Sequence, residues 1–241
     1  AVTMEELTQV VSMDLLAQSR EVALSEDELS AISEAAAEYY ASLSKEENTY
    51  LEVTESDISE YYQHYALAQK LYNSLTNSVN EEVSDDEARV IEIMQIFVAD
   101  STKASDVAAK LERGDDFASV ANNYNELSSI QTTVARDELP KEVEEVAFNL
   151  DNGQSSMIQA GKGFYFIKCL NKYNEELTEA NKSNIVEKRE KEAFDDVYNQ
   201  FVAGLNSSIN KDMWDELTLD TTDGIQTDSF FEIFEKHCGE I

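Results

Sequence analysis

The chain has 241 residues, with 50 acidic against 18 basic side chains, so its formal charge is -32. This charge repels nucleic-acid backbones and anionic lipid headgroups, which argues against both as partners. No run of 18 apolar residues occurs, and His64 and His237 are the only histidines, so neither a bilayer-spanning segment nor a histidine-rich metal site is expected. The sequence predicts no bound metal and no cofactor.

The charge is distributed unevenly along the chain. Residues 1–88 carry a net charge of -17, residues 89–173 carry -4 and residues 174–241 carry -11. Such an asymmetry predicts a distinct central module between two acidic flanks. The alternative interpretation is that long surface helices collect acidic side chains.

The first flank is predicted to be helical. Glycine and proline are scarce, with 7 and 1 in the chain, which favours long helices. Ser25, Ser44 and Ser84 are each followed three residues later by Glu, the pattern of a capping box at a helix start. One predicted apolar stripe at helical spacing consists of Ile58, Tyr61, Tyr65, Ala68, Tyr72 and Leu75.

Two tyrosines of this stripe, Tyr61 and Tyr65, are candidate substrate-binding residues. A tyrosine offers a large contact area with a polar tip, which suits a non-specific grip on unfolded chain. The alternative is that these rings pack in a core between the N-terminal and C-terminal helices.

The central segment alternates between strand and helix patterns. The predicted elements are a strand at 90–98, helices at 103–113, 116–124 and 139–150, and strands at 156–160 and 164–170. The last two strands are joined at residues 161–163 as a hairpin. The order β-α-α-α-β-β predicts a small α+β domain, and a long helix is predicted from Asn174 to about Asn206.

Several stretches of the central segment resemble parvulin-type peptidyl-prolyl isomerases. Residues 103–121 are similar to the first helices of that family, residues 144–155 to its later helix and turn, and residues 163–168 to its closing strand. The resemblance covers roughly residues 88–172. The sequence of helical flank, parvulin module and returning helix is similar to PrsA-type and SurA-type extracytoplasmic foldases. Residues 210–214 and 229–236 resemble the tail of such proteins.

This resemblance implies an α+β fold, mostly α, built from both chain ends. Residues 1–88 and 174–241 would form a helical chaperone-like domain, and residues 89–173 an inserted parvulin-like domain. Unfolded or proline-containing polypeptides would be the partners, at the surface of a Gram-positive bacterium, with a lipid anchor upstream of residue 1. Because the sequence opens at Ala1 without a signal-peptide pattern, any export signal is expected to have been removed or never to have existed.

The positions that carry the isomerase site in the family hold other residues here. By resemblance, the two histidines fall at Gln95 and Tyr165, and the acidic or thiol position falls near Asn125 and Glu126. The proline pocket is similarly changed. Its methionine, phenylalanine and threonine positions hold Leu139, Val143 and Ala160.

Three functions remain open at this point. The first is an extracytoplasmic foldase or chaperone whose isomerase activity is weak or lost. The second is an active isomerase in which Gln95 and Tyr165 supply hydrogen bonds in place of the histidines. The third is a cell-surface interaction module without a chaperone role. A structural alternative for Gln95 and Tyr165 is a satisfied polar pair inside the sheet.

Few other side chains suggest a site. Asp220, Asp223 and Asp228 around Gly224 lack the ligand order of a calcium loop. Cys169 is expected to be buried and Cys238 to be free, and whether the two pair is left open. Neither His64 nor His237 has a partner that the sequence reveals.

Overall fold

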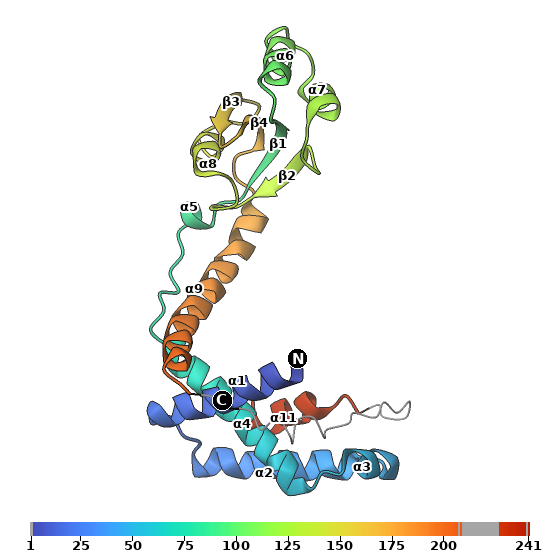
Figure 1. Cartoon of the computed structure of the whole chain (residues 1–241), viewed down its shortest axis with the longest axis vertical. Helices are drawn as coiled ribbons and strands as arrows, with labels where there is room; N and C mark the ends of the chain where they lie inside the picture. The colour runs from blue at the N-terminus through green and yellow to red at the C-terminus, as the bar shows by residue number, and fades with distance from the viewer. Residues whose placement is uncertain (1, 207, 209–226, 240) are drawn as a thin grey trace. The chain divides into compact units, whose positions relative to one another are not determined.

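The structure is a computed structural model, and it describes residues 2–206, 208, 227–239 and 241. It divides into two compact units, Asn80–Arg189 and Ala1–Val79 with Glu190–Ile241 (Figure 1). We call these the inserted unit and the helical unit. The charge partition places the boundaries elsewhere, at 88/89 and 173/174.

The inserted unit extends beyond the near-neutral segment because the residues on either side of that segment bond to each other. The Thr178 hydroxyl accepts a hydrogen bond from the Val90 N–H at 3.1 Å. Farther along, Asn181 donates to the Ala88 carbonyl at 3.0 Å and Arg189 donates to the Asn80 carbonyl at 2.6 Å. The start of the long helix α9 (Glu175–Ala203) is therefore bound to the segment that precedes the sheet.

The inserted unit is built on a four-stranded antiparallel sheet in the order β2-β1-β4-β3. Its strands are β1 (Ile91–Val98), β2 (Gln131–Val134), β3 (Ser155–Ala160) and β4 (Gly163–Asn171). Its helices, besides the start of α9, are α5 (Asp85–Ala88), α6 (Ser101–Glu112), α7 (Phe117–Tyr124) and α8 (Lys141–Ala147). The predicted hairpin is confirmed, since Ala160 lies opposite Gly163 across a two-residue turn.

The predicted element order is wrong in one place because it omits β2. This strand pairs with β1, with Val134 opposite Ile91 and Gln131 opposite Met94. Its sequence, Gln-Thr-Thr-Val, has almost no apolar alternation, because it is a short edge strand held by backbone pairing more than by side-chain burial. The observed order is β-α-α-β-α-β-β, and the predicted α+β class is confirmed.

The two faces of the sheet bury separate clusters. Because successive strand residues point to opposite faces, β1 sends Ile93 to one side and Ile96 to the other. On the first face α8 packs its Val143 against the sheet. On the second face α6 and α7 contribute Val107 and Phe117. The β1 strand is thus apolar on both sides, as the sequence indicates.

The helical unit contains five described helices and the end of α9. They are α1 (Val2–Ser19), α2 (Glu26–Ser42), α3 (Lys45–Leu51), α4 (Glu55–Thr76) and α11 (Phe230–Cys238). Capping boxes start α2 and α3 at Ser25 and Ser44, as predicted, and a third starts α4 at Thr54. In the inserted unit, Ser84 caps α5 through its hydroxyl, which accepts from the Glu87 N–H.

The C-terminal helix α11 packs on α2 and α4 through aromatic rings. We call this group the aromatic cluster; it consists of Tyr39, Tyr62, Tyr65, Phe230, Phe231 and Phe234. The Phe234 ring is fully buried, with ring centroids 5.3 Å from Tyr62 and 4.9 Å from Tyr65. The Tyr62 hydroxyl donates to the Phe230 carbonyl at 2.7 Å, a bond between residues 168 positions apart. Residues from both flanks therefore share one core.

Polar contacts beside this core link the end of α11 to α2. Glu38 of α2 lies 2.6 Å from the Lys236 ammonium and 2.7 Å from the His237 ring. These two contacts, the lysine first, lower the pKa of Glu38. The sequence gives no sign of this pairing because Glu38 and His237 are 199 positions apart.

The predicted stripe on α4 is confirmed at Ile58, Tyr65, Tyr72 and Leu75, which pack in the two clusters of the helical unit, and is wrong at Tyr61. Tyr61 is 58% exposed, whereas its neighbour Tyr62 is buried. The buried residues of the helix are Ile58, Tyr62, Ala66, Leu71 and Thr76. The buried face drifts around α4 because the start of the helix packs on α2 and α11, and its end packs on α1 and α9.

We expect Phe234→Ala to destabilise the helical unit by about 3–5 kcal/mol, since it opens a cavity between Tyr62 and Tyr65. The matched control is Phe231→Ala on the same helix, where the side chain is 54% exposed and the expected cost is about 1 kcal/mol or less. Urea unfolding followed by circular dichroism measures both. Equal losses for the two variants would contradict the central place given to Phe234.

Candidate functional site

Five of the residues expected at the isomerase site gather on the face of the sheet that α8 covers. Gln95 lies opposite Ile167, and Tyr165 lies opposite Phe97. Opposed residues and every second residue of a strand share a face, so Gln95 and Tyr165 point to the same side. The apolar members of the same face are Leu139, Val143 and Ala160. We call these five residues the sheet-face site.

The side chain of Gln95 is already bonded within the fold. It is 9% exposed, and its amide donates to the Ser129 carbonyl at 3.2 Å, while its backbone N–H donates to the Ile130 carbonyl at 2.9 Å. Gln95 thus ties β1 to the segment that leads into β2. A buried polar group with its partner in place contributes to the fold, and its amide is less available to a substrate.

Tyr165 packs on an aromatic neighbour that the resemblance does not point to. The ring centroids of Tyr165 and Phe97 are 4.8 Å apart. The Phe97 ring also lies over Gly163, where an added Cβ would come within 2.3 Å of its Cε2 atom. Glycine is needed there because the ring occupies the space of a side chain. Strand alternation could have indicated Phe97, which lies two residues after Gln95 on the same face.

Glu126 is not brought to the sheet-face site. Its carboxylate lies 2.6 Å from the Lys103 ammonium of α6 and accepts from the Ala99 N–H at 3.0 Å. These contacts, the lysine first, lower the pKa of Glu126. The carboxylate therefore fastens the loop after α7 to the end of β1 and the start of α6.

The side chain of the neighbouring Asn125 bonds to β1 where the backbone of an adjacent strand would otherwise bond. Its side-chain oxygen accepts from the Phe97 N–H at 3.0 Å, and its side-chain nitrogen donates to the carbonyls of Leu127 and Ser129 at 3.1 and 3.2 Å. The Phe97 carbonyl accepts from the Glu126 N–H at 2.9 Å. The loop thus continues the hydrogen bonding of β1 and fixes the backbone that carries Phe97.

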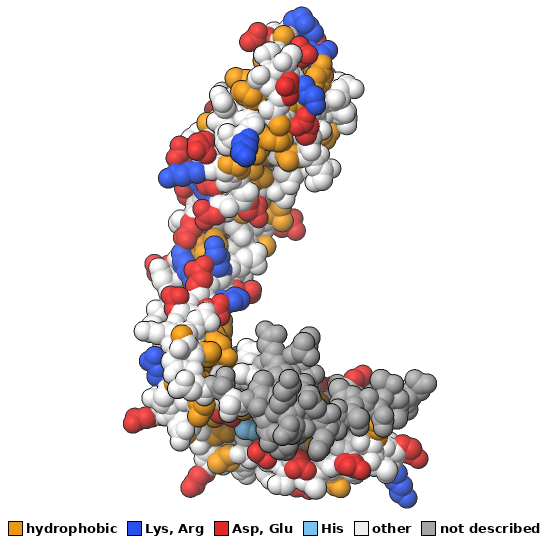
Figure 2. Space-filling view, viewed as in Figure 1, with side chains coloured by type: hydrophobic (Ala, Val, Ile, Leu, Met, Phe, Trp, Pro, Cys, Tyr) orange, Lys and Arg blue, Asp and Glu red, His pale blue; other side chains and the backbone are white. Residues whose placement is uncertain are grey.

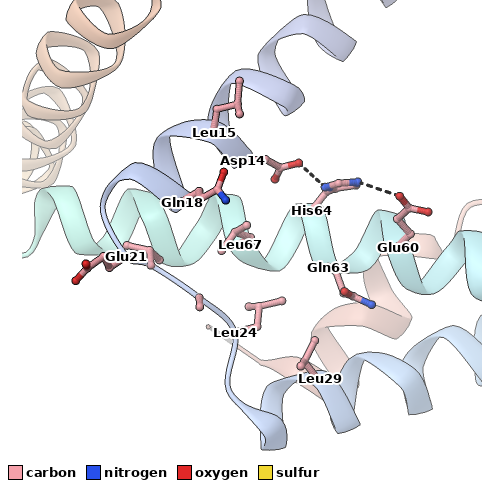
Figure 3. A pocket seen from close by; sticks show the side chains of 12 residues that line it. Asp14, Leu15, Gln18, Glu21, Leu24, Leu29, Glu60, Gln63, His64 and Leu67 are labelled. Atoms are coloured by element: carbon pink, nitrogen blue, oxygen red, sulfur yellow. Dashed lines mark ion pairs between the residues drawn. The ribbon is translucent and has the colours of Figure 1, made fainter.

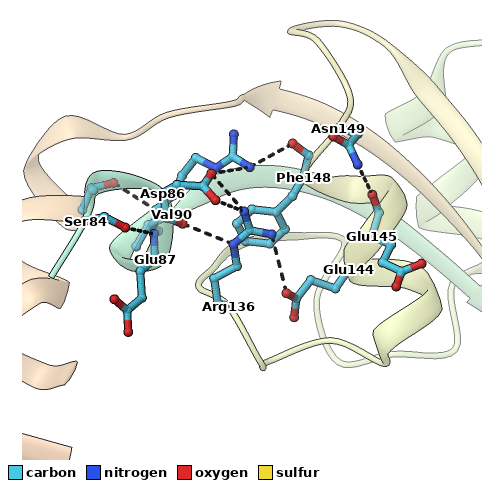
Figure 4. A network of polar contacts seen from close by, with 11 residues as sticks. Ser84, Asp86, Glu87, Val90, Arg136, Glu144, Glu145, Phe148 and Asn149 are labelled. Atoms are coloured by element: carbon cyan, nitrogen blue, oxygen red, sulfur yellow. Dashed lines mark hydrogen bonds and ion pairs between the residues drawn. The ribbon is translucent and has the colours of Figure 1, made fainter.

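A cationic cluster holds α8 beside the sheet (Figure 4). The Arg136 guanidinium lies 3.0 Å from Asp86 and 3.7 Å from Glu144 of α8. It also lies over the Phe148 ring, 4.1 Å from the ring centroid. Arg89 donates to the Phe148 carbonyl at 3.2 Å. These contacts position α8 so that Val143 faces the sheet.

The chemistry available at the sheet-face site is limited. The Tyr165 phenol can donate a hydrogen bond, and Leu139 is a partly buried apolar neighbour. Val143 is fully buried and Ala160 is 6% exposed, so their apolar surface is used by the fold. The arrangement suits weak contact with an apolar ring more than strong polarisation of a twisting amide.

The two tyrosines of α4 differ in environment. Tyr65 belongs to the aromatic cluster, with its ring 4.9 Å from Phe234, so core packing accounts for much of its surface. Tyr61 leaves its ring in solvent. Of the two candidates, Tyr61 alone offers most of its ring to a partner.

Other features add no reactive group in the part of the chain that the structure describes. Cys169 and Cys238 are free thiols, and burial raises the pKa of each. No group of three or more His, Cys, Asp and Glu residues is arranged to hold a metal among the described residues. Asp220, Asp223 and the 210–214 stretch lie outside them. No described helix has the length and apolarity needed to cross a membrane.

The known proteins to which the chain is similar in sequence are PrsA foldases. No protein-family model matches the chain. Foldase protein PrsA 3 of Bacillus anthracis is 28% identical over 149 residues, which cover 59% of this chain and 44% of the relative. Foldase protein PrsA 3 of Bacillus cereus is 26% identical over 150 residues, with the same coverage. The match thus spans less than half the length of either relative.

A solved structure of a PrsA protein has a similar fold. The crystal structure of the peptidylprolyl isomerase PrsA from Bacillus cereus superposes with a TM-score of 0.50 at 20% identity, covering 95% of this chain and 88% of that chain. Likeness at this identity shows the fold alone. The similarity to PrsA-type foldases predicted from the sequence is confirmed.

We expect Asn125→Ala to destabilise the inserted unit by about 1–3 kcal/mol, because it leaves the Phe97 N–H without its acceptor. Asn123→Ala is the matched control, since the exposed Asn123 side chain donates to the Ser119 carbonyl of its own helix and does not bond to β1. Urea unfolding reports the stability, and amide hydrogen exchange at Phe97 reports the local effect. If Phe97 stays as protected in Asn125→Ala as in the control, the loop does not support β1.

Proposed function

We propose that this chain is an extracytoplasmic foldase that holds unfolded polypeptides and has weak or no prolyl isomerase activity. The observation that carries the proposal is the combination of two features. A helical unit is formed from both chain ends, and the parvulin-like insert has Gln95 and Tyr165 where the family has histidines. The names of the relatives, foldase and peptidylprolyl isomerase, support the same class.

Weak isomerase activity follows from the sheet-face site. Rotation about a peptide bond has a barrier of about 18–20 kcal/mol, and an enzyme lowers it with polar groups aimed at the twisted amide. Here the Gln95 amide donates to Ser129 instead. The Val143 side chain is buried between α8 and the sheet, so the floor for a proline ring is small.

A holding role is supported by the surface of the helical unit. Large apolar side chains stand exposed on α1, α2, α4 and α11, among them Leu7, Leu29, Tyr61 and Phe231. On the face of the helical unit that Figure 2 shows, apolar side chains lie among acidic ones. Exposed apolar surface binds unfolded chain, and the strong negative charge keeps the protein and its complexes apart from one another.

The location and partners complete the proposal. Unfolded exported proteins, including proline-containing segments, are the proposed partners, at the surface of a Gram-positive bacterium. A lipid anchor attached upstream of residue 1 would keep the protein there. These points rest on the similarity to PrsA-type foldases.

We expect the chain to delay the aggregation of several unrelated reduced proteins when present at equal concentration, measured by light scattering. The variant Leu7→Ser with Tyr61→Ser removes exposed apolar surface from the helical unit and should shorten the delay by about half or more. The control, Leu127→Ser with Met157→Ser, changes exposed apolar residues of the inserted unit and should keep the delay. Absence of any delay by the unmodified chain would favour an interaction module without chaperone role.

Exchange NMR on a panel of Xaa-Pro peptides tests the isomerase activity. We expect the unmodified chain to leave the exchange rate near the uncatalysed value even at high protein concentration. Gln95→His with Tyr165→His restores the family's side chains and should raise the rate by about tenfold or more. Tyr165→Phe is the control and should change nothing. A clear acceleration by the unmodified chain that Tyr165→Phe abolishes would establish the active isomerase alternative.

A further inference from the structure

A groove of about 720 Å³ runs along the helical unit between α1 and α4 (Figure 3). The α1–α2 segment and α2 close its other sides. We call it the α1–α4 groove. Its lining residues are Asp14, Leu15, Gln18, Glu21, Val22, Ala23, Leu24, Leu29, Glu60, Gln63, His64 and Leu67.

The floor of the groove is aliphatic and partly open to solvent. Leu15 of α1 is 42% exposed and Leu29 of α2 is 39% exposed. Leu24 and Leu67 lie between them in the view of Figure 3. When an apolar partner covers one of these side chains, the free energy falls by roughly 25 cal/mol for each Å² of apolar surface removed from water. A volume of this size accepts several side chains of a peptide.

Among the described residues, the charged groups that line the groove are acids, apart from one histidine. The carboxylates are Asp14 of α1, Glu21 of the α1–α2 segment and Glu60 of α4, while α2 contributes Leu29 and no charge to the lining. Of the nearby bases, Arg20 is exposed and does not line the groove.

The other nearby base is already paired. The Lys70 ammonium lies 2.7 Å from Glu28. The groove therefore presents unneutralised negative charge beside an apolar floor.

His64 lies between two of these carboxylates. Its Nδ1 atom is 2.7 Å from the Asp14 carboxylate, and its Nε2 atom is 3.9 Å from that of Glu60. Asp14 and the imidazole are both about one-third exposed, whereas Glu60 is largely in solvent. The three carboxylates of the lining, Asp14, Glu21 and Glu60, carry a formal charge of -3.

We propose that the α1–α4 groove binds polypeptide segments in which lysine or arginine alternates with aliphatic or aromatic residues. The apolar side chains of the bound segment contact Leu15, Leu29 and Leu67, and its lysine or arginine pairs with Asp14 and Glu60. The proposal rests on the proposed function and specifies which unfolded segments the helical unit selects. Charge complementarity favours this occupant over a second copy of the chain, because the chain itself is strongly acidic.

The pairing between the groove and a basic segment depends on salt. Added salt weakens the binding because the carboxylates of Asp14 and Glu60 are partly exposed.

Fluorescence anisotropy with a short labelled peptide that alternates lysine and leucine tests the assignment. We expect the full chain to bind it, and the affinity to fall as salt is added. A matched peptide with glutamate for lysine, and another with serine for leucine, should bind at least about tenfold more weakly.

Matched variants locate the site. Glu60→Gln should weaken binding by about two- to fivefold, whereas Glu46→Gln, an exposed acid of α3, should not. Leu15→Ser with Leu29→Ser should weaken it by about tenfold, whereas Val11→Ser, 58% exposed on α1 but outside the groove, should not. All of these positions are exposed, so the fold should tolerate the changes, and circular dichroism checks that it does.

The outcomes separate this proposal from the proposed function. Equal binding of the lysine and glutamate peptides, or equal effects of groove and control variants, would overturn the groove assignment. Self-association that Leu15→Ser with Leu29→Ser abolishes would also overturn it, in favour of a second copy of the chain. If reduced proteins aggregate undelayed but the peptide results hold, the foldase proposal fails and the groove assignment stands.

Discussion

The packing of α11 against α2 and α4 is the interaction on which the helical unit depends. Phe234 fills the space between Tyr62 and Tyr65, and the Tyr62 hydroxyl bonds to the Phe230 carbonyl. Without α11 these rings would face water, and the start of α4 would lose one side of its core. The long excursion of the chain into the inserted unit costs little more closure entropy than a short loop, because that cost grows only slowly with length. A complete second fold can therefore be accommodated between the two flanks.

Within the inserted unit, the fold and the sheet-face site respond differently to substitution. The sheet is specified by apolar residues buried on both faces, such as Ile93, Ile96 and Ile167, and exchanging one for a polar residue would be costly. Gln95 and Tyr165 are held by local contacts, with Ser129 and with the Phe97 ring. Residues in such places can change while the scaffold persists. This explains how the sheet can persist while the polar groups on its face change.

The features that the sequence predicts correctly are local ones. The capping boxes at Ser25 and Ser44 and the hairpin between β3 and β4 depend on residues a few positions apart. The omitted strand β2 is short, polar and at an edge, so its pairing leaves no apolar pattern. Tyr61 belongs to the predicted apolar stripe but is exposed, and its neighbour Tyr62 is buried instead. The reason is that α4 changes packing partners along its length. The sheet-face site emerges only through resemblance, and the contact between His64 and Asp14 joins positions too distant for any pattern to reveal.

The position of α11 in the chain has a consequence for biosynthesis. Ribosomes deliver α2 and α4 long before Phe230–Cys238, so for most of translation the rings of Tyr39, Tyr62 and Tyr65 lack their cover. During that interval the nascent polypeptide exposes aromatic surface of the kind that aggregates or binds chaperones. A protein proposed to hold unfolded polypeptides therefore needs protection itself until α11 has been synthesised.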